Sequence, residues 1–279
     1  MNTSCSPGLL PVRIAAIQLC AGADVADNLK QAENCILQAV DTGAQLVALP
    51  EYFPLISARD TDKLTICERE GEGPLQDFLQ QMATRHRIWL IGGTIPLQAD
   101  QPGKVRNSTL VFNDRGERVA RYDKMHLFDF TSAHEQYKES VTIEPGHQVV
   151  TFQSPFGPTG LSICYDLRFP ELFRTMGEVN LIILPAAFTF TTGKAHWEIL
   201  LRARAIENQC YVLAPAQGGT HPHGRITWGY TMIIDPWGEV LACRTEAGPG
   251  IVTAVLDPDR IAAVRNMLPA LRHRTLYGR

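Results

Sequence analysis

The hydrophobic pattern of the first half predicts alternating strands and helices. Five apolar runs are typical of strands: RIAAIQL from Arg13, AQLVALP from Ala44, IWLIGGTI from Ile88, STLVF from Ser108 and ERVARY from Glu117. Between the first two runs, apolar side chains from Leu29 to Val40 recur at helical spacing, and a second amphipathic stretch follows Pro74. The last two runs flank the turn NDRG. The predicted order is strand, helix, strand, helix, strand and hairpin.

The second half repeats this order. Its apolar runs are GLSIC from Gly160, NLIILPA from Asn180, CYVLAPA from Cys210 and TMIIDPWGEVLA from Thr231. Helices are predicted from Pro170 and over 195–208. LVALP at Leu46 has its counterpart in LIILP at Leu181. We therefore predict an α/β fold in which two pseudo-symmetric halves share one core, as a four-layer α-β-β-α sandwich with its sheets face to face.

The chain has no Pro/Gly/Ser-rich linker between its halves. The sequence therefore predicts a single domain over 1–279, with a core of about 11–260 and a C-terminal tail over 261–279. An open, doubly wound sheet is the alternative that alternating strands and helices also permit. Its usual dinucleotide-binding motif is absent, because Gly71 and Gly73 do not follow a strand and Gly92-Gly93 lacks a third glycine.

Composition indicates which binding partners and which cellular compartment to expect for the protein. The hydrophobic content is 45%, the charged content is 20% and the net charge is -3, so nothing draws the molecule as a whole to nucleic acid or to an anionic membrane. No apolar segment is long enough for a membrane span, and MNTSCSPGLLPVR lacks the features of a secretory signal. Seven cysteines without C-x-x-C spacing argue against a disulfide framework or structural zinc, and indicate the cytoplasm. The sequence contains no H-x-x-x-H pair of the kind that would indicate a catalytic metal.

Three side chains of complementary chemistry follow three predicted strands. Glu51 comes directly after LVALP, Lys124 follows ERVARY, and Cys164 ends GLSIC just before a predicted helix. Taken singly, each has an ordinary structural explanation: a capping acid, a surface lysine and a core thiol. Together they are a base, a cation and a nucleophile at strand ends, where layered α/β folds place their sites.

Amide hydrolysis would use this grouping. A free thiol has a pKa of about 8.5, so at neutral pH it needs a base, and Glu51 could take its proton. Lys124 and the backbone N–H of Tyr165 are candidates to stabilise the tetrahedral oxyanion. Glu51 would then protonate the departing ammonia and activate water against the thioester.

Several ordered motifs across essentially the whole chain resemble the nitrilase superfamily of carbon-nitrogen hydrolases. They are LPEYF, YDKMHLFD, CYDLRFPE, TTGKAHWEILLRARAIENQCYV and YTMIIDPWGEVLA. The resemblance implies the four-layer sandwich, a catalytic triad of Glu51, Lys124 and Cys164, and no metal or organic cofactor. It also implies a second glutamate that assists the base, for which Glu139 matches best and Glu135 is the alternative. Members form oligomers built on a dimer, and we expect the C-terminal tail at such a contact.

HWEILLRARAIENQCY from His196 and MLPALRHRTLYGR from Met267 most resemble the branch that contains deaminated glutathione amidase and ω-amidase. Their substrates carry carboxylates, so a cation is expected near the nucleophile. Arg168 is our candidate, with a salt bridge to Asp166 or Glu171 as its structural alternative.

The pocket walls are predicted from residues near the strand ends. Phe128 opens the segment FDFTSAHEQYK, which differs from better-known members of the branch where a substrate-covering loop would lie. Phe188, Thr191 and Thr192 follow the strand NLIILP and are expected to line the pocket, although the threonines could instead cap the next helix.

Two further functions stay open on the sequence alone. The same triad could hydrolyse a nitrile or an N-carbamoyl compound. The chain could also be a non-catalytic binding or scaffold protein that keeps the fold.

Overall fold

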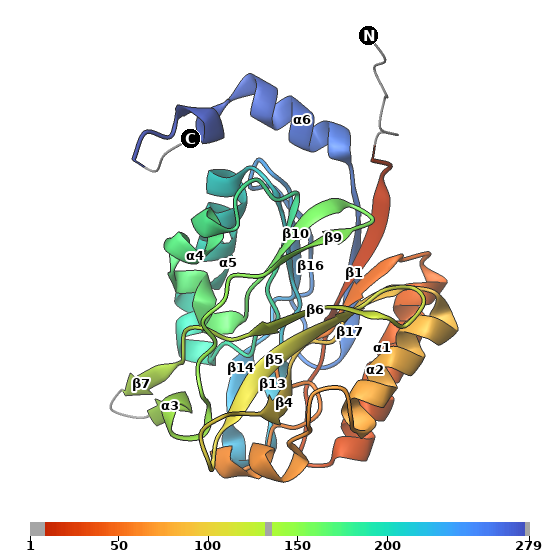
Figure 1. Cartoon of the computed structure of the whole chain (residues 1–279), viewed down its shortest axis with the longest axis vertical. Coiled ribbons are helices and arrows are strands. Elements are labelled where there is room, and N and C mark those ends of the chain that lie inside the picture. The colour runs from red at the N-terminus through yellow and green to blue at the C-terminus, as the bar shows by residue number, and fades with distance from the viewer. Residues whose placement is uncertain (1–8, 132–135, 277–279) are drawn as a thin grey trace.

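Strand β1 (Val12–Gln18) divides its apolar side chains between the two faces of a sheet. The computed structural model describes residues 9–131 and 136–276 (Figure 1). Ile14 and Ala16 point into a core shared with a second sheet, whereas Ala15 and Ile17 pack under helices. Because successive side chains of a strand alternate between faces, an almost wholly apolar strand must be covered on both sides.

The first sheet has the strand order β17-β1-β2-β3-β5-β4, with β6 beside β5. Its remaining strands are β2 (Leu46–Ala48), β3 (Trp89–Ile91), β4 (Ile95–Gln98), β5 (Val105–Phe112), β6 (Arg118–Asp123) and β17 (Gly250–Leu256). The central strands β1, β2 and β3 run parallel, with Ala16 opposite Ala48 and Ala48 opposite Ile91. Antiparallel strands flank them on both sides.

The second sheet has the order β16-β15-β12-β11-β10-β9. Its strands are β9 (Thr151–Ser154), β10 (Gly157–Leu161), β11 (Leu181–Ile183), β12 (Tyr211–Ala214), β15 (Met232–Ile234) and β16 (Val240–Cys243). Three parallel strands, β10, β11 and β12, again lie between antiparallel neighbours. This repetition confirms the two pseudo-symmetric halves that the sequence predicts.

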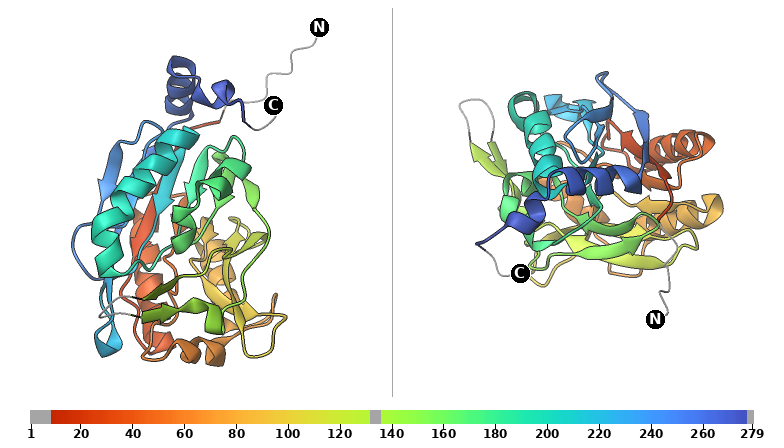
Figure 2. Two further views of the ribbon diagram at one scale, coloured as in Figure 1. Left: turned by 90° about the vertical axis from the view of Figure 1, so that its left-hand side faces the viewer. Right: turned by 90° about the horizontal axis from the view of Figure 1, so that it is seen from above.

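Helices form the two outer layers. They are α1 (Val25–Asp41), α2 (Pro74–His86), α4 (Pro170–Thr175) and α5 (Phe190–Asn208), and a further helix, α6 (Pro258–Met267), lies outside these layers. Ala32, Ile36 and Leu79 from α1 and α2 pack on the first sheet, and Phe173 and Leu201 from α4 and α5 pack on the second. Figure 2 shows α5 lying along the outer face of the second sheet. The predicted α-β-β-α sandwich is confirmed.

Short elements gather at one end of the sandwich. The hairpin β7 (Asp129–Thr131) and β8 (Gln136–Lys138) leads into α3 (Glu139–Thr142). A second hairpin, β13 (Gly218–Thr220) and β14 (Ile226–Trp228), encloses the single turn η3 (Pro222–Gly224). Two further short 3₁₀ helices are η1 (Asp60–Ile66) and η2 (Cys164–Arg168), and η4 (Ala270–His273) follows α6. All of these elements except η4, which lies with α6 at the other end, are near the carboxyl ends of the parallel strands (Figure 1).

The C-terminal part of the chain joins the two halves. Strand β17 pairs with the whole of β1, from Val12 opposite Leu256 to Gln18 opposite Gly250. Helix α6 follows and lies across one end of the molecule (Figure 1), where Arg265 donates hydrogen bonds to the carbonyl oxygens of Gln209 and Val179. The first sheet is therefore completed by the last strand of the second half.

Two of the predicted elements differ in the structure for clear local reasons. Helix α5 begins at Phe190 rather than Ala195, because the Thr189 side chain accepts a hydrogen bond from the N–H of Thr192 and caps an earlier turn. The run IWLIGGTI divides into β3 and the start of β4, because Gly93 has a φ of 53° and turns the chain.

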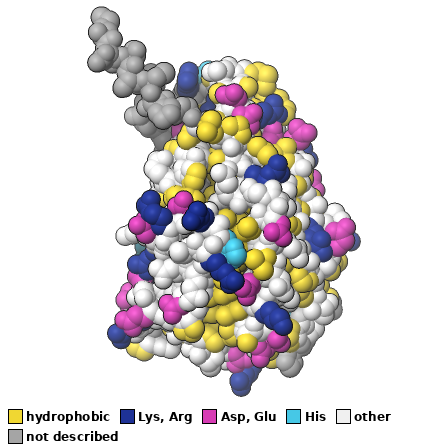
Figure 3. Space-filling model, turned by 90° about the vertical axis from the view of Figure 1, so that its right-hand side faces the viewer, with side chains coloured by type: hydrophobic (Ala, Val, Ile, Leu, Met, Phe, Trp, Pro, Cys, Tyr) yellow, Lys and Arg dark blue, Asp and Glu magenta, His cyan; other side chains and the backbone are white. Residues whose placement is uncertain are grey.

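The surface carries charges of both signs. On the face shown in Figure 3, basic and acidic side chains are interspersed among polar and apolar ones. Within residues 9–131 and 136–276, no helix is both long enough and apolar enough to cross a membrane.

Candidate active site

Cys164 lies at a sharp turn between a strand and a helical segment. Strand β10 ends at Leu161 and η2 begins at Cys164, whose φ of 48° is in the left-handed region. Its N–H donates to the carbonyl oxygen of Pro185 at 2.9 Å, which ties the turn to the end of β11. A left-handed non-glycine residue costs about 1–3 kcal/mol and is typical of functional turns. The turn places the thiol at the end of the second sheet.

Glu51 occupies the matching place after β2 in the first sheet, and its side chain is wholly buried. Oε2 accepts a hydrogen bond from the N–H of Ala187 at 2.9 Å, and Oε1 accepts one from Asn107 Nδ2 at 2.9 Å. Ala187 follows β11 in the second sheet and lines the same pocket as Cys164. Its backbone N–H thus ties the candidate base to the wall of the pocket that holds the candidate nucleophile.

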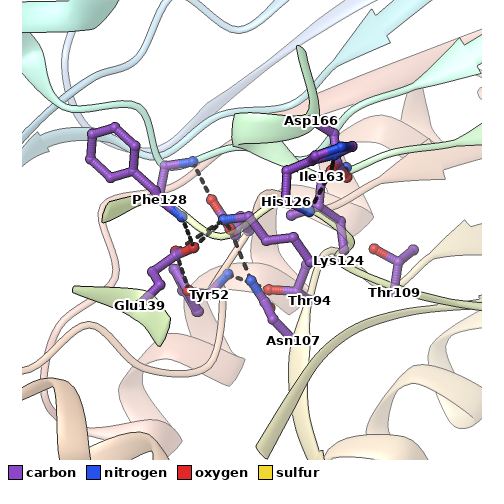
Figure 4. A network of polar contacts seen from close by, with 12 residues as sticks. Tyr52, Thr94, Asn107, Thr109, Lys124, His126, Phe128, Glu139, Ile163 and Asp166 are labelled. Carbon is purple, nitrogen blue, oxygen red and sulfur yellow. Dashed lines mark hydrogen bonds and ion pairs between the residues drawn. The ribbon is translucent and has the colours of Figure 1, made fainter. Parts of the chain in front are cut away.

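Lys124 joins two carboxylates in the interior. Its Nζ lies 2.9 Å from Glu51 Oε1, and 2.9 Å and 2.8 Å from Oε1 and Oε2 of Glu139 (Figure 4). Burial by itself lowers the pKa of this ammonium group, but the charges of Glu139 and Glu51 outweigh burial and hold the pKa well above its ordinary value. Lys124 is therefore a permanent cation and cannot serve as the base.

Glu139 is the first residue of α3, directly after β8. Its Oε1 accepts a hydrogen bond from the Tyr52 hydroxyl at 2.8 Å, and its Oε2 accepts one from the N–H of Phe128 at 2.7 Å. Burial raises the pKa of this carboxyl, but the charge and hydrogen bonds of Lys124 produce a net lowering. Glu139 is thus held as an anion. The alternative, Glu135, lies outside the described residues.

The environment of the Cys164 thiol opposes ionisation. Burial raises its pKa, the Glu51 charge raises it further, and Lys124 only partly compensates, so the pKa lies well above the ordinary range. The resting side chain is a neutral thiol at physiological pH. A base must therefore remove the proton as the sulfur attacks.

A small pocket opens beside the sulfur. Five of the six residues predicted to bind substrate line it together with Cys164, Ala187 and Thr189: Phe128, Tyr165, Arg168, Phe188 and Thr192. Thr191, the sixth, is exposed and does not line this pocket. Because α5 begins at Phe190, Thr191 lies in the first helical turn and its side chain is carried to the outside.

Arg168 is oriented by aromatic rings rather than by an acid. Its guanidinium carbon lies 5.7 Å from the ring centre of Tyr165 and 5.5 Å from that of Phe188. Nη1 is 3.3 Å from His196 Nδ1. The described part of the chain provides no ion pair from Arg168 to Asp166 or Glu171, so the salt-bridge alternative is wrong. The cation faces the pocket.

A wider hollow of about 1350 Å³ lies elsewhere, beside β4, β5 and β6. Two of the three arginines that line it are paired: Arg106 with Asp100 and Glu144, and Arg121 with Glu70 and Asp123. No nucleophile lines it. The smaller pocket is the candidate active site because it alone of the two contains the Cys164 thiol. Among the residues whose placement is described, no group of three or more His, Cys, Asp or Glu could hold a metal.

Comparison with known proteins agrees with this geometry. The family profile described as "Carbon-nitrogen hydrolase" matches residues 13–266, which is most of the chain.

The chain belongs to the carbon-nitrogen hydrolase family.

Relatives of this hydrolase extend over nearly its whole length. It is 41% identical over 265 residues to deaminated glutathione amidase from Yersinia enterocolitica, covering 93% of this chain and 92% of the relative. It is 43% identical over 270 residues to deaminated glutathione amidase from Synechocystis sp., covering 95% and 98%. The human protein of that name is 38% identical over 287 residues, covering 100% and 87%. Family and relatives show that the chain is an amidase that hydrolyses carbon-nitrogen bonds other than peptide bonds.

Solved structures share the fold. The NitFhit protein of C. elegans superposes with a TM-score of 0.85 and 35% identity, covering 97% of this chain and 67% of that one. Nit3 from Saccharomyces cerevisiae, described as a member of branch 10 of the nitrilase superfamily, gives a TM-score of 0.82 and 32% identity, covering 95% and 97%.

The most informative residue that the sequence interpretation missed in this hydrolase is Asp166. Its carboxylate is fully buried and accepts hydrogen bonds from the Tyr122 hydroxyl at 2.7 Å and from the N–H groups of His126 and Ile163 at 3.1 Å and 2.8 Å. His126 Nδ1 is a further neighbour at 2.7 Å. Figure 4 shows Asp166, Ile163 and His126 together beside Lys124. Asp166 thus ties the segment of Lys124 to the turn of Cys164.

Three more polar residues, the buried Asn107 and Gln217 and the half-buried Tyr52, support Glu51 and Glu139. Asn107 bonds Glu51, and the N–H of Tyr52 donates to Thr94 Oγ1 at 2.9 Å, which secures a left-handed residue with a φ of 54°. Gln217 Nε2 donates to the carbonyl oxygen of Glu51 at 2.9 Å. Polar residues within apolar runs were the available signal, since a buried polar group needs a partner.

Proposed function

We propose that Cys164 is the nucleophile, Glu51 the general base and acid, and Lys124 the cation that stabilises the oxyanion. The observation that carries this proposal is the position of Lys124 Nζ, which lies within 2.9 Å of both Glu51 and Glu139 in a buried site that also holds the thiol. In this proposal Glu139 keeps Lys124 in place. Among the described residues, the backbone N–H of Tyr165 has no backbone acceptor, so it is a second candidate donor to the oxyanion.

The proposed reaction has two halves. Glu51 takes the Cys164 proton while sulfur bonds to the amide carbon, and the carbonyl oxygen becomes an oxyanion. When the tetrahedral intermediate collapses, the C–N bond breaks, Glu51 protonates the departing nitrogen, and a thioester remains. Water then attacks the thioester as Glu51 removes its proton. The C–S bond breaks, and the sulfur takes that proton back from Glu51.

We propose deaminated glutathione as the substrate, with α-ketoglutaramate as the alternative of the ω-amidase type. Support comes from the names of the relatives and from Arg168, a cation without an ion pair among the described residues, on the wall of the Cys164 pocket, where it suits a substrate carboxylate. Deaminated glutathione contains no primary amide, so its hydrolysis releases an amine, whereas α-ketoglutaramate releases ammonia. The nitrogen product therefore separates the two substrates.

The test is a substrate panel with product identification. Purified protein is offered deaminated glutathione, α-ketoglutaramate, an N-carbamoyl amino acid and an aliphatic nitrile, and amine, ammonia and carbon dioxide are measured. We expect the highest kcat/KM for deaminated glutathione. Carbon dioxide would instead indicate a carbamoyl substrate, and acid formed from the nitrile would indicate a nitrilase. A protein that turns over none of the four, and whose Cys164 is not protected from iodoacetamide by any of them, would favour a binding role.

We further propose one domain over the whole chain, a homodimer or larger homo-oligomer, and a cytoplasmic location. The tail exposes Met267, Leu268 and Leu276, which are 63%, 47% and 89% accessible, and such side chains are suited to a subunit contact. Six cysteines in the described ranges are free thiols, which suits a reducing compartment. Light scattering after gel filtration measures the mass of the assembly directly.

A further inference from the structure

Tyr52 forms a wall of a second small pocket, outside the Cys164 pocket. Three cationic side chains, Arg59, Lys63 and Arg225, line it, against the single carboxylate of Asp60. Arg59 is 79% exposed and is neutralised by Asp62 at 3.0 Å. The positive charges of Lys63 and Arg225 are not neutralised in this way.

The side chain of Lys63 is only 13% exposed, yet its positive charge is only weakly compensated by an acid. Its Nζ is 3.9 Å from Asp60 Oδ1, a long contact with a side chain that is itself 49% exposed. It also lies 5.3 Å from the centre of the Tyr52 ring. Burial, which is incompletely offset by Asp60 and Glu139, lowers the pKa of this ammonium group. A desolvated ammonium without a close carboxylate is well prepared to bind an anion.

Arg225 follows η3, in the connection between β13 and β14. Its Nε is buried and has no hydrogen-bond partner within the described residues. The guanidinium carbon lies 5.4 Å from the centre of the Tyr137 ring. A buried guanidinium N–H without an acceptor costs about 1–3 kcal/mol, so the arrangement is incomplete without a further ligand.

Glu139 does not neutralise these two cations at close range. Both of its oxygens are occupied, by Lys124, by the Tyr52 hydroxyl and by the N–H of Phe128. The Tyr52 side chain lies between, because its hydroxyl contacts Glu139 while Lys63 lies over its ring. The positive charges of Lys63 and Arg225 are therefore available to an anion in the second pocket.

The second pocket is close to the first. Phe128 lines the Cys164 pocket, and its ring centre is 5.6 Å from that of Tyr137, which in turn lies against Arg225. Tyr52 makes the corresponding link through Glu139. Tyr52 separates Lys63 from Glu139, and Tyr137 and Phe128 separate Arg225 from the Cys164 pocket, so a substrate of several bonds' length has to extend past these rings to reach both pockets.

We propose that Lys63 and Arg225 form a carboxylate-binding subsite, which holds an anionic group of the substrate remote from the scissile amide. Arg168 and this pair would then bind two carboxylates of one molecule. The inference rests on the proposed function and deepens it: the preferred amides are dianionic and extended, and short amides with one carboxylate leave the subsite empty.

The test compares deaminated glutathione with its glycine methyl ester, in which a methyl group removes the charge of the distal carboxylate. The measured quantity is the ratio of kcat/KM for the acid to kcat/KM for the ester. We expect Lys63→Met and Arg225→Met each to lower this ratio by about 10-fold or more, since a hydrogen bond to a charged group contributes about 1.5–3 kcal/mol. Lys63→Arg keeps the charge and should retain most of the ratio. Arg115→Met, on the exposed turn between β5 and β6, is the matched control for loss of one positive charge.

Equal losses for acid and ester in both variants would overturn the subsite, because they would show a general effect on folding or on Glu139. Failure of the proposed substrate looks different, since the parent would then turn over neither compound. In that case the protection of Cys164 from iodoacetamide by the acid is compared with the protection by the ester. Stronger protection by the acid supports the subsite. Protection that is the same for both compounds, or unaffected by Lys63→Met, contradicts the proposal.

Discussion

Glu139 and Lys124 form the polar centre of the site at the scale of single residues. Each oxygen of Glu139 accepts from Lys124 and from one other donor, and Lys124 also holds Glu51. Breaking a buried ion pair by removing one partner costs about 3–5 kcal/mol, because the other charge stays buried. The network therefore contributes to stability as well as to the proposed chemistry.

Glu139→Gln should show a stability loss that depends on pH. The folded-state pKa of Glu139 is lowered, so its ionised form stabilises the fold above the unfolded pKa of about 4.3, and that contribution is lost as pH falls through the folded value. We expect a loss of about 3 kcal/mol at pH 7 that shrinks below pH 4, measured by urea unfolding. Glu178→Gln, at a carboxylate that is 65% exposed, is the control. A loss that is constant or larger in acid contradicts the assignment.

Tyr52→Phe removes the hydroxyl that donates to Glu139. A hydrogen bond to a charged group contributes about 1.5–3 kcal/mol, so we expect a decrease of this size in the free energy of unfolding and a lower kcat. Tyr230→Phe is the matched control, because that ring stacks on Trp228 and its hydroxyl has no hydrogen bond among the described residues. Equal effects of the two substitutions on stability would be inconsistent with the contact.

The sequence could indicate Glu51, Lys124 and Cys164 because each combines suitable chemistry with the end of an apolar strand. It could not indicate Asp166 in the same way. Two of the hydrogen-bond donors to Asp166, Tyr122 and His126, precede it by 44 and 40 positions, and the neighbouring Arg168 offered a plausible local ion pair instead. Contacts between segments so far apart depend on sheet packing, which local patterns do not encode.

At the scale of elements, the start of α5 positions one wall of the pocket. Gly193 lies in its first turn, and a Cβ there would overlap Trp228 of β14. The Trp228 ring is fixed in turn by stacking on Tyr230 at 4.3 Å and by edge contact with Phe190 at 5.2 Å. Close approach of α5 to the β13–β14 hairpin therefore requires glycine.

Gly193→Ala should destabilise the protein although alanine favours helices. The gain in helix propensity is about 1 kcal/mol, whereas overpacking against a fixed side chain costs about 1–3 kcal/mol. We expect a net loss of about 1 kcal/mol in thermal unfolding and a higher KM, because Thr192 in the same turn lines the pocket. Lys194→Ala, at an exposed neighbouring position, should be nearly neutral. A more stable Gly193→Ala variant would show that the two elements can separate.

The strands with strong apolar runs could be predicted, and β1, β2, β11 and β12 lie where the pattern places them, whereas β10 begins at Gly157, before the run GLSIC, and ends at Leu161. Strand β17 was not identified, because six of its seven residues are only partly buried or exposed and its partner β1 lies at the other end of the sequence. The hairpin of β7 and β8 was also missed. Its residues are half-buried or exposed, so they lack the apolar alternation that marks a strand.

At the scale of the whole molecule, the two halves are joined at several places. Strand β17 completes the first sheet from the C-terminal side of the sequence, and Trp89 of β3 stacks on Phe152 of β9 at 6.2 Å. The two inner sheet faces contribute to one continuous apolar core. Neither half could keep its core covered without the other.

The halves should therefore unfold together. Trp89 is the one tryptophan of the first half, while Trp197, Trp228 and Trp237 lie in the second. We expect the fluorescence of a Trp89→Phe variant and the far-UV circular dichroism to give coincident urea transitions. The variant itself is less stable, so both probes are measured on the same protein. Two separated transitions would indicate independent domains and contradict the single-domain proposal.

The central claim is that the thiol of Cys164 carries out amide hydrolysis, and the kcat of Cys164→Ala measured with the best amide of the panel tests it most directly. Removing a catalytic nucleophile typically lowers kcat by about 10⁶-fold. Cys243→Ala, at a partly buried thiol on β16, is the matched control and should keep the parent rate. We predict loss of at least about 10⁴-fold for Cys164→Ala in a protein that remains folded. A Cys164→Ala protein that hydrolyses the amide at the parent rate would contradict the account.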